Sequence, residues 1–236
     1  MLIFNLFLSI SLQIISNLPK SVLAFLQIIE HTDQSMIIYF EDMCDKFIHV
    51  LSAAPTIENL QMILPVFQKL SYKLEHWYSK KLEPNFELNK FYDDLYNKNH
   101  ILSIDEIIEL EENLPKIEQH DYENYKPTEY ERISEKIIKQ LIVTISLVIS
   151  SGSRIGLNQI NKIVKSCLAC LGNNPKLLNL IHQLWQPLIT CFSKTRDLHL
   201  LRICVDMTLL FTNFGRDFLK QRTEIKKKIY KAHSAV

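Results

Sequence analysis

The sequence predicts an all-α protein, an α-solenoid built from antiparallel helix pairs of the HEAT or armadillo type. Apolar residues recur with the 3.6-residue period of a helix along most of the 236-residue chain. Glycine is scarce, with four residues where average usage would give roughly sixteen. Two helix pairs in the second half begin about 45 residues apart, which lies in the range of HEAT and armadillo units. Neighbouring pairs in such arrays bury their apolar faces against each other.

The scarcity of glycine also argues against several function classes. Phosphate-binding loops, dinucleotide folds and tight strand turns require glycine where φ is positive or where the backbone approaches a ligand. The motifs of serine hydrolases, zinc proteases and P-loop enzymes do not occur in the sequence. We therefore expect no enzyme, no catalytic residue and no cofactor. The formal net charge of +1 gives no overall attraction to nucleic acid, so none is expected as a partner.

The N-terminal segment, residues 1–83, is predicted to hold four HEAT-like helices. The first, over about 2–16, carries no charge, which leaves two interpretations: a packing helix at the end of an array, or a signal peptide or membrane helix. No positive charge precedes this stretch, no small-residue cleavage site follows it, and polar residues interrupt it. We favour the packing helix and expect no membrane contact. The second helix runs from Pro19 to about His31.

The third and fourth helices have clear end signals. Asp33 is expected to cap the third helix at its N-terminus, and Pro55 ends that helix. Thr56 then opens a long helix that contains Pro65. We expect a kink there, because proline lacks a backbone N–H and its ring clashes with the preceding turn.

Residues 84–127 are predicted to be an exposed acidic insertion with one short helix near 104–113. That helix begins with a capping box, and prolines and acids surround it. Long breaks of this kind tend to be functional or disordered, so the acids are candidates for contact with a basic partner surface. A solvated charged face is the alternative. The candidate residues are Asp105, Glu106, Glu109, Glu111 and Glu112.

The C-terminal segment, residues 128–236, is predicted to hold regular HEAT repeats. Thr128 and Glu131 form a capping box that opens its first helix. A second helix is expected over 157–171, closed by Gly172 at the C′ position.

Two more helices and a basic terminal helix follow. Pro175 opens the third helix of this segment, Asp197 caps the fourth, and Gly215 ends it. The last predicted helix, 216–231, is basic, as the polar outer face of a terminal repeat requires. Contact with nucleic acid or anionic lipid is the alternative interpretation of its charge.

Two motifs in the C-terminal third carry a family resemblance. The first is a His-Gln-x-Trp turn, and the second is a Gly-Asp-Phe-Leu sequence followed by an arginine. The residues that match are His182, Gln183 and Trp185, then Gly215, Asp217, Phe218, Leu219 and Arg222. With the helices and acidic link between them, they resemble the last HEAT repeats of the Tel-two-interacting protein one family. The resemblance spans about residues 90–222, although Arg216 interrupts the second motif and the chain is far shorter than family members.

The resemblance implies a non-enzymatic scaffold of the TTT co-chaperone complex. Proteins of this family join Tel-two and Tti-two, and with the Hsp90 machinery they support folding and assembly of phosphatidylinositol-3-kinase-related kinases. Protein partners of these kinds are therefore what the resemblance implies. Two other hypotheses remain: a different HEAT or armadillo adaptor, such as a transport or phosphatase scaffold, and a membrane-anchored helical protein.

The five cysteines lie within apolar helical patterns, and their number is odd. Both features favour buried free thiols in a reducing compartment, so we expect the cytoplasm, with the nucleus as a second location. Cys167 and Cys170 have the spacing of metal ligands, but no second pair follows them. Core packing is the favoured interpretation and no metal is expected; zinc binding or redox chemistry is the alternative.

Two further sites have a functional and a structural interpretation. His182 and Trp185 lie three residues apart on one helical face, where tryptophan is typical of partner-binding hot spots. The favoured interpretation is a packing corner between helices. Asp217 is expected to stabilise the start of the last helix through the helix dipole, and Phe218 is expected to enter the core.

Overall fold

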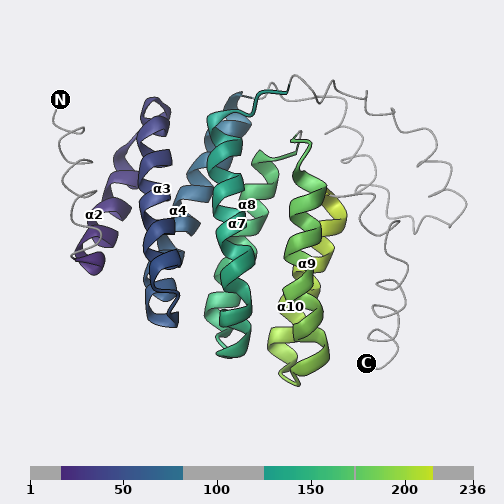
Figure 1. The fold of residues 1–236 in the computed structure, drawn as a ribbon. Coiled ribbons are helices and arrows are strands. Elements are labelled where there is room, and N and C mark those ends of the chain that lie inside the picture. Colours follow the sequence, from purple (N-terminus) through teal and green to yellow (C-terminus); the bar gives the residue numbers. More distant parts are fainter. Residues whose placement is uncertain (1–16, 82–124, 173, 215–236) are drawn as a thin grey trace, which may run out of the picture. The chain divides into compact units, whose positions relative to one another are not determined.

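The computed structural model describes residues 17–81, 125–172 and 174–214 (Figure 1). Every regular element in these residues is helical. In chain order they are α2 (Leu18–His31), the 3₁₀ turn η1 (Gln34–Met36), α3 (Ile37–Ala53), α4 (Ile57–Lys81), α7 (Glu129–Ser150), α8 (Arg154–Cys170), α9 (Leu177–Lys194) and α10 (Leu198–Phe214). The helices predicted near 2–16, 104–113 and 216–231 lie outside the described residues.

The chain divides into two compact units. The first unit contains residues 1–78 and 127–236, and the second contains residues 79–126. The helices described below belong to the first unit, except for the last turn of α4. The segments predicted on either side of the insertion therefore contribute to one compact unit.

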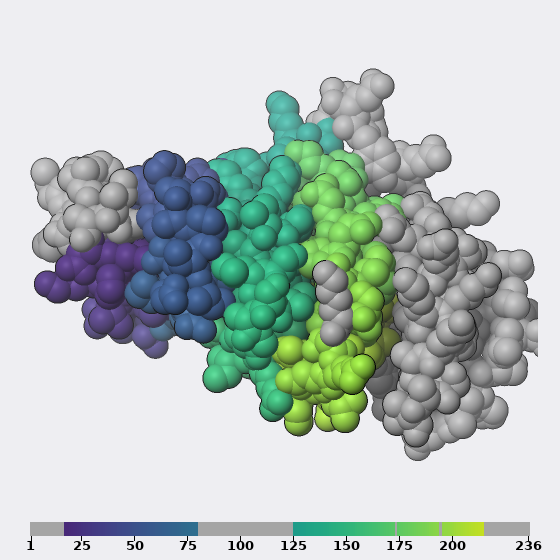
Figure 2. All heavy atoms as spheres, turned by 60° about the horizontal axis from the view of Figure 1, so that its bottom comes forward, coloured from purple at the N-terminus to yellow at the C-terminus, as the bar shows by residue number. Residues whose placement is uncertain are grey.

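The helices of the first unit form antiparallel pairs that stack on one another. Residues 151–153 join α7 to α8, and residues 195–197 join α9 to α10. Between pairs, α3 packs on α7, α7 on α9, and α8 on α10. The colours of Figure 2 accordingly follow one another in sequence order across the described helices. The predicted fold class, all-α with the stacked pairs of an α-solenoid, is confirmed.

Aromatic side chains hold the N-terminal helices together. Phe25 of α2 contacts Phe40 and Phe47 of α3, with ring centroids 5.7 and 5.4 Å apart. Phe40 in turn stacks on Trp77 of α4 at 5.8 Å. These rings are buried, and each removes a large apolar area from water. They explain why these three helices pack as one body.

The start of the third predicted helix differs from the expectation. Asp33 does not cap the α-helix itself; its carboxylate accepts a hydrogen bond from the backbone N–H of Ser35 at 2.9 Å and opens η1. The α-helix begins only at Ile37. The capping signal was correct, but a tighter turn comes between the cap and the helix.

The prolines within helices do not end them. Pro65 lies inside α4, as predicted, and Pro187 lies inside α9. The capping box of α7 is also confirmed, since the side chain of Glu131 accepts from the backbone N–H of Thr128 at 2.8 Å and its own N–H reaches the Thr128 hydroxyl at 3.4 Å.

The turns after α7 and α8 confirm one expectation and correct another: Gly172 stands at C′ of α8, directly after the C-cap Leu171, but α8 begins earlier than predicted. Gly152, with φ of 66°, is the glycine with positive φ in the described part of the chain, whereas Gly172 keeps an ordinary negative φ. The N–H groups of Gly152 and Ser153 reach back to the carbonyls of Ile149 and Val148 at 3.1 and 3.3 Å, the two bonds of a Schellman motif. Ser153 then caps α8, which therefore begins before the predicted 157–171.

Candidate protein-binding surfaces

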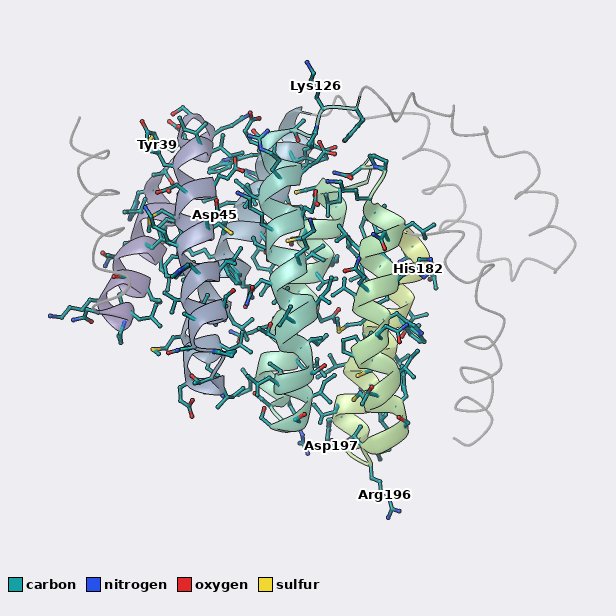
Figure 3. The ribbon with its side chains drawn as sticks, viewed as in Figure 1. Tyr39, Asp45, Lys126, His182, Arg196 and Asp197 are labelled. Atoms are coloured by element: carbon teal, nitrogen blue, oxygen red, sulfur yellow. The ribbon has the colours of Figure 1, made fainter. Side chains whose placement is uncertain are left out.

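The predicted His182–Trp185 corner lies on α9 (Figure 3). Trp185 is 2% exposed, and its ring lies 6.1 Å from that of Phe192 on the same helix. His182 is half-buried, and Gln183 is exposed with its amide donating to Asn179 at 3.2 Å. The structure therefore places Trp185 in the core, where packing accounts for it, and leaves only its two motif neighbours within reach of a partner.

The other predicted site residues cannot be placed. The acids Asp105, Glu106, Glu109, Glu111 and Glu112 and the motif residues Gly215, Asp217, Phe218, Leu219 and Arg222 lie outside the described residues. Their assigned roles stay predictions.

Ion pairs link α3 to α7 along their interface, and we call such an ion-paired interface between helices a seam. Arg132 and Lys136 of α7 donate to the Glu41 carboxylate of α3 at 3.1 and 2.9 Å, and Lys136 also reaches Asp45 at 2.7 Å. Burial opposes ionisation of Glu41, but the hydrogen bonds from Arg132 and Lys136 outweigh it and lower its pKa below the ordinary 4.5. The charges of this seam are thus satisfied within the molecule.

A second seam is closed in the same way next to α9. The carboxylate of Glu135 on α7 is bridged by Lys139 at 2.7 Å and by Lys176, which precedes α9, at 3.2 Å. Burial again opposes ionisation, yet the hydrogen bonds from the two lysines lower the pKa of Glu135 below its ordinary value. Together the two seams give α3, α7 and α9 a surface whose charges pair across helices.

The N-termini of α8 and α10 are joined by one ion pair. Arg154 Nη2 lies 3.0 Å from Asp197 Oδ2, and Asp197 also caps α10 by accepting from the backbone N–H of His199 at 2.9 Å. The predicted cap is therefore confirmed, and it has a tertiary partner that the sequence did not reveal. Figure 3 shows Asp197 at the lower ends of the helices, where α10 begins.

The exposed side of α8 and α10 differs from the ion-paired seams. Three cations there, Lys162, Lys165 and Arg202, are exposed, and the described residues offer none of them a carboxylate within ion-pair distance. Large apolar side chains are exposed beside them. We name this surface the α8–α10 face, made of Ile155, Lys162, Lys165, Leu198, Arg202 and Leu209.

Sequence reasoning did not single out this face, although a signal for it was present. Within α10, Leu198 and Leu209 repeat eleven residues apart, which returns to the same side of a helix, and Arg202 falls between them. They are 78% and 57% exposed, opposite the buried stripe of that helix. A helix that is apolar on its outer side as well as its inner side indicates a second contact.

The five cysteines are buried free thiols, in agreement with the favoured interpretation. Burial raises the pKa of Cys170 to about 12, and it also raises the pKa values of Cys44 and Cys167. A thiol hydrogen bond links Cys191 and Cys204, raising the pKa of Cys204 and lowering that of Cys191. Nucleophiles and metal ligands need the thiolate, which burial of this kind disfavours. In the described ranges, no group of three or more metal-binding side chains lies together.

The fold defines the class of protein, an all-α chain of stacked antiparallel helix pairs as in an α-solenoid. Comparison with models of protein families, with curated proteins and with solved structures gave no match to this chain. Among the described helices, none combines the length and the apolar character that crossing a bilayer requires.

Proposed function

We propose that this chain is a non-enzymatic scaffold that binds other proteins along its stacked helix pairs. The observation that carries this proposal is the contrast between two sides of the same stack. The seams of α3, α7 and α9 pair their charges internally, whereas three cations of the α8–α10 face find no carboxylate partner among the described residues and lie near exposed leucine and isoleucine side chains. Exposed apolar groups bordered by charge are typical of protein interfaces.

The rigidity of the stack supports a scaffold function. Apolar residues form one continuous core through the helix pairs, and ion pairs tie α3 to α7 and α8 to α10. A surface built on packed helices keeps its side chains in fixed positions, which lowers the entropic cost of binding a partner. Such a protein acts stoichiometrically, by holding partners rather than by converting a substrate.

We further propose that the partners are those of the Tel-two-interacting protein one family. The resemblance supports this through its first motif, His182, Gln183 and Trp185, although these residues lie in the middle of α9 and not in a turn. The predicted acidic link between the motifs corresponds to Asp197, which caps the second helix of that pair. On this proposal the chain joins Tel-two and Tti-two and, with the Hsp90 machinery, supports phosphatidylinositol-3-kinase-related kinases in the cytoplasm and nucleus.

Affinity purification tests both the scaffold function and the proposed partners. The chain, tagged at its C-terminus, is expressed in its own source cells, and bound proteins are identified by mass spectrometry. We expect Tel-two, Tti-two or a kinase of that class to be enriched over a tagged, unrelated helical-repeat protein. Enrichment of transport or phosphatase subunits instead would leave a scaffold but reject the TTT assignment. A chain that enriches no protein over the control would contradict the scaffold function itself.

A further inference from the structure

We propose that the α8–α10 face docks an acidic amphipathic helix of a partner protein. This inference rests on the proposed scaffold function and specifies the chemistry of one partner segment. It is carried by three cations that have no carboxylate partner in the described part of the chain and that lie among exposed apolar side chains on two neighbouring helices.

The register of the two helices brings the cations together. Because α9 lies between them in the chain, α8 and α10 run in the same direction, and the Arg154–Asp197 ion pair aligns their first turns. An offset of 43 residues then places Arg202 level with Gln159, within one turn of Lys162. Lys165 follows one turn further along α8. The three positive charges thus occupy one region of the face.

The apolar side chains lie on the same exposed sides of these helices. Ile155 and Leu198 are each 78% exposed, and they directly follow the two residues of the aligning ion pair. Leu209 continues the line of Leu198 along α10. A partner helix with apolar residues at i, i+3, i+4 and i+7 would cover this line, while carboxylates on its flanks would meet the cations.

Other charges near the face do not cancel the cations. Asp206 is exposed one turn beyond Arg202, but the two side chains do not come within ion-pair distance. Asp197 is already paired with Arg154. By comparison, Arg132, Lys136 and Lys176 on the opposite seams each have a carboxylate partner within the molecule. Counted over the described residues, the α8–α10 face is therefore net positive, which selects an acidic partner.

A protein helix fits these observations better than nucleic acid does. Affinity for nucleic acid comes mainly from neutralising several phosphates, and the described residues of this face offer three cations without a carboxylate partner. Phosphates also provide no apolar surface to cover Ile155, Leu198 and Leu209, which would stay in water. Burial of those side chains by an amphipathic helix removes that cost.

The test uses the purified full chain and a fluorescein-labelled designed helix of leucine and glutamate, with leucine at the helical spacing. Fluorescence anisotropy should show binding that weakens as salt rises. The double variant Lys162→Glu/Arg202→Glu should bind about tenfold more weakly, because two attractive contacts become repulsive. The charge-matched control Lys20→Glu/Lys126→Glu, at exposed positions elsewhere, should bind like the wild type. Leu209→Ala should also weaken binding, and circular dichroism should show that every variant is folded.

Several outcomes would overturn the inference. Equal affinity of both double variants would show that the charge effect is not local to this face. Equal binding of a twin peptide with lysine in place of glutamate would exclude charge complementarity. Tighter binding of a labelled single-stranded oligonucleotide through Lys162 and Arg202 would assign the face to nucleic acid. If the Lys162→Glu/Arg202→Glu chain still captured every partner in affinity purification, the scaffold function would stand and this face would be rejected.

Discussion

At the scale of single residues, the glycines that follow α7 and α8 occupy equivalent positions after a helix but have different backbone conformations. Gly152 has a φ of 66°, which side chains strain to adopt, whereas Gly172 has an ordinary φ with only Ala169 O, at 3.8 Å, near the place of a Cβ. Both glycines follow a helix, but only Gly152 closes a Schellman motif.

We expect Gly152→Ala to lower the free energy of unfolding by about 1 kcal/mol, because alanine resists positive φ. Gly172→Ala should leave stability unchanged or raise it slightly, since it restricts only the unfolded chain. Urea unfolding followed by circular dichroism measures both changes. Equal destabilisation by the two variants would contradict the assigned backbone conformations.

The second prediction at this scale concerns the family motif. Trp185→Ala should destabilise the fold by about 3–5 kcal/mol, because it empties a buried site beside Phe192. Gln183→Ala, at an exposed position of the same motif, should change stability by less than about 0.5 kcal/mol. Thermal unfolding of both variants measures these changes. A Trp185→Ala chain that keeps normal stability but loses its partners in affinity purification would favour the hot-spot interpretation over packing.

At the scale of helices, the ion pairs act as links between elements that are distant in sequence. Glu41 ties α3 to α7, Glu135 ties α7 to the start of α9, and Asp197 ties α10 to α8. Burial opposes ionisation of each carboxylate, but hydrogen bonds outweigh it and lower its pKa below the ordinary value. For Glu41 and Glu135 the donors are cations, and for Asp197 they are Arg154 and the backbone N–H groups of His199 and Leu200. The links therefore depend on pH.

The dependence on pH follows from the direction of the shift at Glu135. Its pKa in the folded chain lies below the ordinary 4.5. The stabilisation that the ionised carboxylate gives the folded chain is therefore complete above pH 4.5 and is lost as the pH falls through the folded pKa. We expect Glu135→Gln to lower the free energy of unfolding by roughly 0.5–1 kcal/mol at neutral pH. Asp42→Asn, which removes a more exposed pair with Lys46, should cost less.

Denaturant unfolding of the wild type and Glu135→Gln across the acid range tests this link. The difference between the two chains should shrink as the pH drops below 4.5 and the wild-type carboxyl takes up its proton. A difference that stays constant through the acid range would show that the charge of Glu135 does not stabilise the fold.

At the scale of the whole molecule, the reactivity of the thiols measures whether the helices stay packed. All five cysteines are buried, from Cys44 in α3 to Cys204 in α10. We expect a thiol-reactive disulfide reagent to label none of them quickly in native conditions, because burial keeps the reagent from all five thiols. The raised pKa values of Cys44, Cys167, Cys170 and Cys204 also oppose formation of the thiolate. Labelling should follow unfolding and rise with urea. Rapid labelling of Cys191 and Cys204 alone, without urea, would instead indicate that the last helix pair opens separately.

Local signals in the sequence specified most of the helix boundaries. The capping box of Thr128 and the cap at Asp197 were predicted because a short polar side chain satisfies backbone N–H groups within its own turn. The interior position of Pro65 was predicted for a similar reason, since the helical pattern continues on both sides of it. Such interactions span only a few residues, so the sequence alone displays them.

The start of α8 was predicted incorrectly because its N-cap is Ser153, which lies between the two glycines and begins the helix earlier than they indicated. A stretch with two glycines indicated a turn as far as Leu157, yet the helix begins at Arg154. Gly156 lies inside the helix, where a Cβ would come within 3.1 Å of Val148 of α7. The glycine is therefore there to let two helices approach, and neither the partner helix nor the distance is visible in the sequence.

Residue patterns alone predict that this protein is helical, that its helices pair and repeat, and that its thiols are buried. Period, caps and glycine content carry this information because they act between near neighbours in the chain. Which charges find partners is set instead by the packing of the helices. Glu41 meets Arg132 and Lys136 across a seam, while Lys162 and Arg202 meet no described carboxylate. Pairing between helices depends on distances of a few ångströms between residues far apart in sequence, which only the packed stack sets.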